Sequence, residues 1–369
     1  MPTASSRERA RQIGLVIASF AIGLIALELG LRVANGQLFA WPNYVLQARE
    51  VLPGFQSQEY LHDDLLGYVP RPGYSTPKGW NAPDVRFDAA GFRVAGDVPA
   101  GSGAPILAVG DSYTFGEEVN NGETWPSILQ GLSGRPVLNA GVAGYGFDQI
   151  VLRAGLLAPS VRPSAIVVSF IADDLRRTEA SRLWSADKPW FEIDDGAKGG
   201  ELMLRGVPVP PRTDPRRTLT LAQRVLGHSY LVDFVLRRLN LLEDWFGDHI
   251  KVHPAGTGER IGCLLTDRLR DLQQSGGRPL LLVAQYDPYV FRTDGFGAEQ
   301  RRITGLVLDC ARKRGLKVLD TFDAIARHTG PGGPLGLYAQ WHMNAAGNAL
   351  VAGLIAQVLK EPAFKEQGT

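Results

Sequence analysis

The chain has 369 residues, of which 44% are hydrophobic and 21% are charged, so an ordinary globular core is expected. Its formal net charge of +1 gives no electrostatic basis for binding nucleic acid. Neither the two cysteines nor the six histidines have metal-ligand spacing, so no metal or other cofactor is expected. These quantities do not specify an oligomeric state.

The N-terminal segment has the pattern of a membrane anchor. Three basic residues come first: Arg7, Arg9 and Arg11. An apolar stretch follows, uncharged over residues 13–27 and, apart from Glu28, apolar as far as Leu31. That length is about what a bilayer core requires, and the arginines should remain in the cytoplasm. We therefore expect a cytoplasmic tail over residues 1–12 and a transmembrane signal anchor over 13–34. A cleaved signal peptide is the alternative.

Residues 35–104 are expected to form an irregular leader that packs on the main domain. Their apolar runs are short, and glycines and prolines interrupt them, the prolines including Pro53, Pro70, Pro72, Pro77 and Pro83. Such residues favour turns over long regular elements, so short hairpins are the expected local structure.

Five short apolar runs then alternate with helix-like stretches over residues 105–362. Their residues are apolar on consecutive positions, as in strands buried on both faces. Strand–helix alternation predicts a parallel sheet with helices on both faces and a site at the carboxyl ends of the strands. The runs are PILAVG from Pro105, PVLNAG from Pro136, AIVVSFI from Ala165, PLLLVAQ from Pro279 and LKVLDTF from Leu316.

An insertion over residues 175–260 interrupts this alternation. Residues 188–210 have the pattern of a hairpin that turns at Asp-Gly and Gly-Gly, and residues 229–246 are amphipathic. Insertions beside strand ends often form a lid or a substrate wall, although a subdomain without that role is equally compatible. Its aromatic residues are candidates for stacking on sugars or for plain packing: Trp184, Trp190 and Phe191.

Candidate site residues follow the first three runs and the last one. Ser112 follows the first run, Gly144 lies in the loop after the second, and Asp173 follows the third. His342 lies on a loop before a helix that Asn344 can cap. A serine, a base and an unobstructed backbone N–H at one sheet edge suit nucleophilic attack on an acyl group.

These blocks resemble those of the SGNH, or GDSL-type, hydrolases. GDSYTFG resembles the first block, NAGVAGYG the glycine block and HMNAAG the block with the base histidine, while FIADD lies where Gly-x-Asn-Asp falls. The resemblance implies a three-layer flavodoxin-like fold with a five-stranded parallel sheet. It also implies Ser112 as nucleophile, His342 as base, and an oxyanion hole from the N–H groups of Ser112 and Gly144 with a third donor at Asp173. Supporting positions are Asp111, Asp174, Gln340 and Asn344.

The leader motifs add a location to this resemblance. HDDLLGYVPRPG, residues 62–73, and RFDAAGFR, residues 86–93, resemble those of membrane-anchored bacterial members that act on extracellular polymers. The expected location is therefore the bacterial inner membrane, crossed once, with the main domain on the periplasmic or extracytoplasmic side.

The chain departs from the family pattern at two positions. The third oxyanion donor is an asparagine in the family, whereas Asp173 stands here, and its charge would need neutralising, by Arg176 or Arg177. The family also places an aspartate two or three residues before the histidine, where this chain has Gln340 and an alanine. His342 must then be oriented by the Gln340 side chain, by a backbone carbonyl or by a carboxylate from elsewhere.

The function that the sequence favours is hydrolysis of acyl esters, above all acetyl esters, on an envelope or exported glycan. Two alternatives remain: an O-acyltransferase that uses the same residues, and an inactive protein that binds a glycan or a partner. Export would permit a disulfide between Cys263 and Cys310, although two buried thiols are equally compatible.

Overall fold

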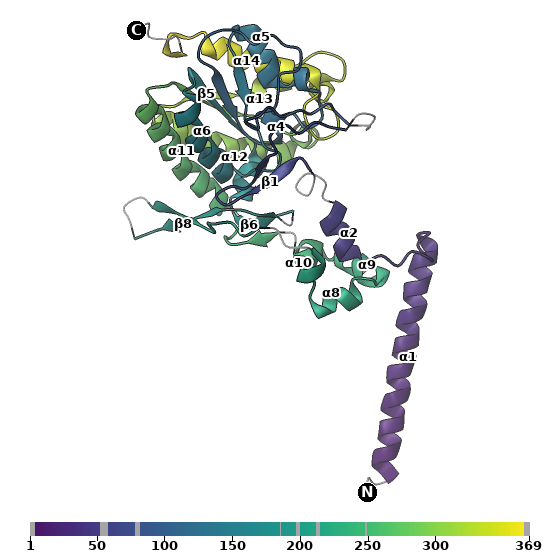
Figure 1. Ribbon diagram of the computed structural model, residues 1–369. Coiled ribbons are helices and arrows are strands. Elements are labelled where there is room, and N and C mark those ends of the chain that lie inside the picture. The colour runs from purple at the N-terminus through teal and green to yellow at the C-terminus, as the bar shows by residue number, and fades with distance from the viewer. Residues whose placement is uncertain are drawn as a thin grey trace. The chain divides into compact units, whose positions relative to one another are not determined.

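The chain forms two compact units in the computed structural model (Figure 1). The first comprises Met1–Pro53 and Thr213–His249, and the second comprises Gly54–Arg212 and Ile250–Thr369. The structure describes residues 4–51, 58–77, 82–184, 186–196, 200–211, 215–247 and 249–364. Pro53, the side chain of Arg7 and part of the predicted hairpin turn, residues 197–199, lie outside them.

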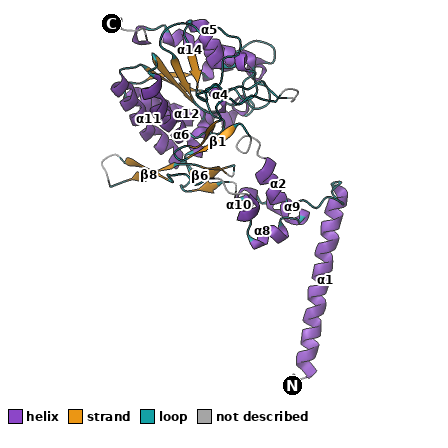
Figure 2. Cartoon of the chain, viewed as in Figure 1, coloured by secondary structure: helices purple, strands orange, loops and turns teal. Residues whose placement is uncertain are grey.

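A five-stranded parallel sheet forms the centre of the second unit, in the strand order β12-β11-β5-β3-β4 (Figure 2). Each strand falls within one of the five apolar runs, which confirms the predicted three-layer α/β fold. Every residue of β3, β5 and β11 is buried, as expected for strands covered on both faces. The strands are β3 (Ile106–Val109), β4 (Val137–Asn139), β5 (Ala165–Phe170), β11 (Leu280–Ala284) and β12 (Lys317–Asp320).

Helices cover both faces of this sheet (Figure 1). Alternate residues of β3 enter different cores: Leu107 packs with the side of α6, α11 and α12, and Ala108 packs with the side of α5 and α14. This alternation is the two-residue period of a strand. The helices are α5 (Trp125–Ser133), α6 (Phe147–Val161), α11 (Thr257–Gly276), α12 (Asp294–Lys313) and α14 (Ala345–Leu359).

The expected leader, residues 35–104, is divided: residues 35–53 belong to the first unit, and the part that follows packs on the main domain through a short antiparallel hairpin, β1 (Tyr60–Asp63) and β2 (Gly67–Pro70). Tyr68 of β2 is buried, and its hydroxyl donates a hydrogen bond of 2.9 Å to the carbonyl of Ala143. The hairpin thus holds the loop that follows β4.

The predicted hairpin within residues 188–210 is confirmed, with β8 (Trp190–Asp194) antiparallel to β9 (Glu201–Arg205). Phe191 is fully buried beneath the guanidinium of Arg268, so this side chain packs and is not free to stack on a sugar. A second small sheet has the order β10-β6-β7. Its strands are β6 (Ala180–Leu183), β7 (Ala186–Asp187) and β10 (Ile250–Lys251).

The first unit combines the N-terminal helix with the middle of the insertion. Within α1 (Ala4–Ala34), residues Arg11–Ala34 are long and apolar enough to cross a membrane, a property that signal sequences share. The amphipathic segment of residues 229–246 forms two helices, separated where Asn240 adopts a positive φ of 54°. Helices of the unit are α2 (Tyr44–Val51), α8 (Leu221–Leu226), α9 (Tyr230–Arg238) and α10 (Leu242–Phe246).

Several shorter helices complete the described chain. They are α4 (Ser112–Phe115), α7 (Ala172–Arg177), α13 (Phe322–Ala326), and the 3₁₀ helices η1 (Asn121–Glu123), η2 (Pro215–Thr218), η3 (Pro288–Phe291), η4 (Gly333–Leu337) and η5 (Pro362–Phe364).

A disulfide joins the two cysteines, Cys263 on α11 and Cys310 on α12. Of the two states that the sequence allowed, the structure therefore contains the bonded one. The bridge joins residues at a sequence separation of 47 and closes a loop that includes β11 and most of α12.

Removing this bridge should destabilise the second unit. Closing a loop of this length is worth about 4 kcal/mol in the chain-entropy description, so the double variant Cys263→Ala, Cys310→Ala should unfold at a lower denaturant concentration. Chemical denaturation of the full chain in detergent measures the effect. Reductant should lower the wild-type midpoint and leave that of the double variant unchanged; an equal midpoint for the wild type and the variant would contradict the prediction.

Candidate functional site

The turn after β3 places Ser112 at the carboxyl edge of the sheet. Asp111 caps α4, because its Oδ1 accepts a hydrogen bond of 3.0 Å from the N–H of Tyr113. A glycine is required at position 110, just before Asp111, because a Cβ there would lie 2.1 Å from Oγ1 of Thr114. Ser112 is thereby fixed as the first residue of a buried helical turn.

His342 approaches Ser112 from the loop before α14. Its Nε2 lies 2.9 Å from Oγ of Ser112. Two anchors hold this loop: Asn344 caps α14, as predicted, and the hydroxyl of Tyr113 donates a hydrogen bond of 2.8 Å to the carbonyl of Trp341. Tyr113 directly follows Ser112 in α4, so its hydrogen bond ties the loop of His342 to the turn that carries Ser112.

Glu118 occupies the other side of the imidazole. Its Oε1 lies 3.5 Å from Nδ1 of His342. Backbone N–H groups orient this carboxylate, with Gln340 donating at 2.8 Å and His342 at 3.2 Å. A carboxylate from elsewhere in the chain therefore lies beside the histidine, whereas Gln340 contributes its backbone and its residue is exposed.

Sequence reasoning did not select Glu118. The signal available was the pair Glu117–Glu118 directly after GDSYTFG, two charged residues beside a candidate nucleophile. Glu117 also reaches the histidine, with its Oε2 3.5 Å from Nε2. Both carboxylates thus lie near the imidazole of His342, one at each nitrogen.

The carboxylates change how the histidine titrates. Burial by itself would lower the pKa of His342, but the contact with Glu118 and the charges of Glu117 and Asp111 outweigh it and raise that pKa above its ordinary value. Burial would raise the pKa of Glu118, yet His342 and the backbone N–H groups lower it to about 2. Glu118 is therefore ionised at neutral pH and stabilises an imidazolium.

Arg93, the last residue of the leader motif RFDAAGFR, holds the loop that carries Glu118. Its buried guanidinium donates hydrogen bonds to the carbonyls of Phe115 at 2.7 Å, Gly116 at 2.6 Å and Val119 at 2.6 Å. Burial lowers the pKa of Arg93 to about 10, so the group stays charged at neutral pH. The leader thus fixes the backbone on both sides of Glu118.

Gly144 lies in the buried loop after β4. It has a positive φ of 76°, a conformation that side chains other than glycine rarely adopt. The preceding carbonyl, of Ala143, accepts the hydrogen bond from Tyr68. The leader hairpin therefore also fixes the loop that carries the predicted oxyanion donor.

Asp173 lies in the first turn of a short helix, α7, that follows β5. Its side chain is 51% exposed and forms an ion pair with Arg176, which also donates a hydrogen bond of 2.9 Å to Oε1 of Gln300. Of the two arginines expected to neutralise this carboxylate, Arg176 is the one that pairs with it.

The second arginine, Arg177, serves a buried pair of carboxylates. Its Nη1 lies 2.7 Å from Oδ1 of Asp174 and 4.0 Å from Oδ2 of Asp111. Burial raises the pKa of Asp111, and burial together with the charge of Asp111 raises the pKa of Asp174 well above its usual range. Two buried carboxylates behind Ser112 therefore share one arginine.

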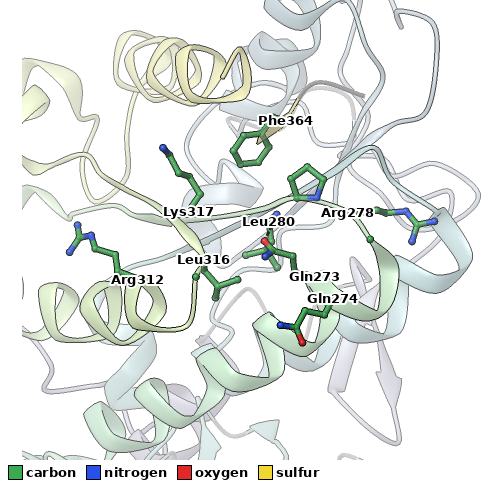
Figure 3. A pocket seen from close by; sticks show the side chains of 11 residues that line it. Gln273, Gln274, Arg278, Leu280, Arg312, Leu316, Lys317 and Phe364 are labelled. Carbon is green, nitrogen blue, oxygen red and sulfur yellow. Dashed lines mark hydrogen bonds between the residues drawn. The ribbon is translucent and has the colours of Figure 1, made fainter. Parts of the chain in front are cut away.

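A pocket of about 560 Å³ lies at the other edge of the sheet, where β11 and β12 begin (Figure 3). Two of its cations are already paired, Arg312 with Asp309 and Lys317 with Glu361. None of the residues around Ser112 lines it. The residues that do are Gln273, Gln274, Gly277, Arg278, Pro279, Leu280, Arg312, Gly315, Leu316, Lys317 and Phe364.

Solved structures with detectable similarity include three hydrolases. LAE5, an alpha/beta hydrolase enzyme from the Lake Arreo metagenome, is 15% identical over 73% of this chain and 100% of its own, with a TM-score of 0.41. The lipase/acylhydrolase from Enterococcus faecalis is 15% identical over 70% of this chain and 96% of its own, with a TM-score of 0.37. A catalytic mutant of Axe2, an acetylxylan esterase from Geobacillus stearothermophilus, is 12% identical over 73% of this chain and 99% of its own, with a TM-score of 0.38.

The sequence itself matches a family model. No curated protein matches the chain. The model of the GDSL-like lipase/acylhydrolase family matches residues 108–350, which is more than half of the chain and includes both Ser112 and His342. The chain therefore belongs to the GDSL-like lipase/acylhydrolase family.

Proposed function

We propose that this chain hydrolyses carboxylic esters with Ser112 as nucleophile, His342 as general base and Glu118 as the acid that orients the base. The observation that carries the proposal is the line of contacts from Oγ of Ser112 to Nε2 of His342, at 2.9 Å, and from Nδ1 to Glu118, at 3.5 Å. A nucleophile beside a base that a third group orients is the arrangement used for acyl transfer.

The proposed reaction has two acyl-transfer steps. Oγ of Ser112 attacks the ester carbonyl carbon while Nε2 of His342 takes its proton, and the N–H groups of Ser112 and Gly144 stabilise the oxyanion. The C–O bond to the alcohol then breaks, the histidine gives its proton to the departing oxygen, and an acyl-serine remains. Water, deprotonated by the same histidine, attacks the acyl-serine, which releases the acid and restores the serine.

The proposed substrate is an acyl ester, above all an acetyl ester, on an envelope or exported glycan. Trp341 directly precedes His342, is 50% exposed and packs on Tyr289 with 5.5 Å between ring centroids. The guanidinium of Arg292 lies over the ring of Tyr289, 4.9 Å from its centroid. An exposed aromatic pair beside the base can pack against the apolar face of a sugar ring. Trp184, by contrast, lies against the guanidinium of Arg177.

Residues 13–34 are proposed to be a single membrane anchor in a bacterial inner membrane, with the second unit on the periplasmic or extracytoplasmic side. The apolar span and the arginines before it support this orientation. The disulfide between Cys263 and Cys310 supports the same side, because such bonds persist in oxidising compartments.

Ser112→Ala should abolish labelling by a fluorophosphonate probe and release of acetate from both p-nitrophenyl acetate and an acetylated oligosaccharide. The substitution removes one hydroxyl without opening a core cavity, so the melting temperature should scarcely move. Hydrolysis by Ser112→Ala at the wild-type rate would remove Ser112 from the mechanism. Glycan binding by a wild-type chain that neither reacts with the probe nor releases acetate would identify the binding protein instead, and acetyl transfer to an added glycan would identify the transferase.

Glu118→Gln should lower kcat on p-nitrophenyl acetate by up to about 10⁴-fold, because the imidazole loses the group that orients it. It should also shift the acidic limb of the kcat/KM profile to lower pH, since the raised pKa of His342 depends on this carboxylate and the base must be neutral. Glu117→Gln is the matched control. It removes a charge near Nε2 and should shift the limb in the same direction while leaving the kcat plateau much less affected.

Equal plateaus for wild-type and Glu118→Gln enzyme would contradict an orienting role for Glu118. The pH profiles also test the sign of the shift: a limb that moves to higher pH in Glu118→Gln would exclude stabilisation of the imidazolium by this carboxylate.

Asp173→Asn should raise turnover of an acetyl ester near neutral pH, by up to about 100-fold. The amide would supply a neutral donor at the predicted oxyanion position, where one donor is worth roughly 10²–10³ in turnover. Arg176, now without its partner, would keep its hydrogen bond to Gln300. A loss beyond about tenfold in a well-folded variant would instead give Asp173 a positive role in the reaction.

A further inference from the structure

The carboxyl-terminal part of α1 caps a helix of the insertion. Glu28 of α1 accepts hydrogen bonds from the backbone N–H groups of Tyr230 at 2.9 Å and Leu231 at 2.7 Å. The hydroxyl of Ser229 donates to the same carboxylate at 2.8 Å. These donors belong to the first turn of α9, where a negative charge is favoured. Residues about 200 positions apart in sequence thus form one capped helix end.

Arg32 completes this junction. It is fully buried, its Nε lies 2.5 Å from Oε1 of Glu28, and its Nη2 donates a hydrogen bond of 2.5 Å to the carbonyl of His228. Its guanidinium also lies 3.8 Å from the ring centroid of Trp41. Glu28 and Arg32 are the two charged residues between positions 12 and 34, and both are satisfied by this junction.

The junction lies at the depth of a membrane surface. The span Arg11–Ala34 has 24 residues, about 36 Å of helix, against a hydrocarbon core of about 30 Å. Glu28 precedes the end of the span by about 9 Å, so a centred helix places its carboxylate about 6 Å inside the core boundary. An unsatisfied carboxylate there would be costly, and the insertion supplies its partners.

Several apolar side chains of the same unit are exposed. They repeat at four-residue spacing, which places Leu221 with Val225 on one side of α8, and Val235 of α9 with Leu239, the residue that caps the end of α9. Leu221 is 78% exposed, and Phe39 in the loop after α1 is 92% exposed. We name these five residues the apolar rim. Arg237, on the opposite side of α9 from Val235 and Leu239, is also exposed.

We propose that residues 35–48 and 215–247 form a collar that lies in the outer headgroup region of the bilayer, with its apolar rim in contact with lipid. The proposal rests on the membrane anchor proposed above and goes beyond it, because it requires α1 to remain attached. Cleavage after α1 would remove Glu28 and Arg32 and leave the N–H groups of Tyr230 and Leu231 without the carboxylate that accepts from them. Apolar residues with charged residues on the other face are the composition of helices that lie in this region.

Lipid contact is tested on the full chain in nanodiscs of phosphatidylethanolamine and phosphatidylglycerol. Leu221→Cys and Val235→Cys, labelled with an environment-sensitive fluorophore, should be quenched about twofold or more strongly by lipids spin-labelled near the headgroup than the matched control Arg237→Cys on the same helix. Equal quenching at the three positions would overturn the proposal. If the two labels instead become shielded from solvent as the protein concentration rises, with no dependence on lipid, the proposal is overturned, and a second copy of the chain covers the apolar rim.

Retention of α1 is tested by the intact mass of the chain extracted from membranes. The collar requires that residues before Glu28 are present in the mature chain. A mature chain that begins after Leu31, or one that a salt wash releases from membranes, would overturn the proposal. Both readouts are independent of esterase activity, so an inactive Ser112 site would contradict the proposed function and leave this result unchanged.

Discussion

The buried guanidinium of Arg93 is the interaction on which the candidate site depends. It donates hydrogen bonds to three carbonyls of the segment just after Ser112, those of Phe115, Gly116 and Val119, and so satisfies acceptors in a buried position. Because Glu118 lies between Gly116 and Val119, a residue of the leader holds the backbone that carries this carboxylate near Ser112. The irregular segment before the sheet is therefore a structural part of the site, and its second motif ends in the residue that makes the contact.

The arrangement of charges around Ser112 follows a simple division. On the solvent side, Glu118 and Glu117 raise the pKa of His342 and favour its protonated form. On the buried side, burial raises the pKa values of Asp111 and Asp174, and the charge of Arg177, which both carboxylates share, only partly opposes this rise. Arg177 thus offsets part of the carboxylate charge behind the serine, while Glu117 and Glu118 keep negative charge beside the histidine. The pair of Asp173 and Arg176 extends this neutralisation to the helix after β5.

The insertion contributes to both units of the chain. Its hairpin and small sheet belong to the unit that holds Ser112, whereas α8, α9 and α10 belong to the unit that holds α1. The reason is electrostatic, because two charged residues of an apolar helix require partners and the first turn of α9 supplies them. A collar of this kind would give a membrane-bound esterase a second attachment to the bilayer besides its helix.

The sequence by itself determined the features that depend on local patterns. Five apolar runs predicted the five parallel strands, the uncharged stretch after the arginines predicted α1, and Asn344 predicted the start of α14, because strand period, apolar length and capping are read from neighbouring residues. The positions of Ser112 and His342 at one edge followed from strand direction. Only the tertiary structure decided which carboxylate accompanies the histidine, which arginine pairs with Asp173, and that Glu28 caps α9. Each of these contacts is selected by packing: Glu118 binds a loop more than 200 residues away, and the adjacent residues Arg176 and Arg177 point about 100° apart around one helix.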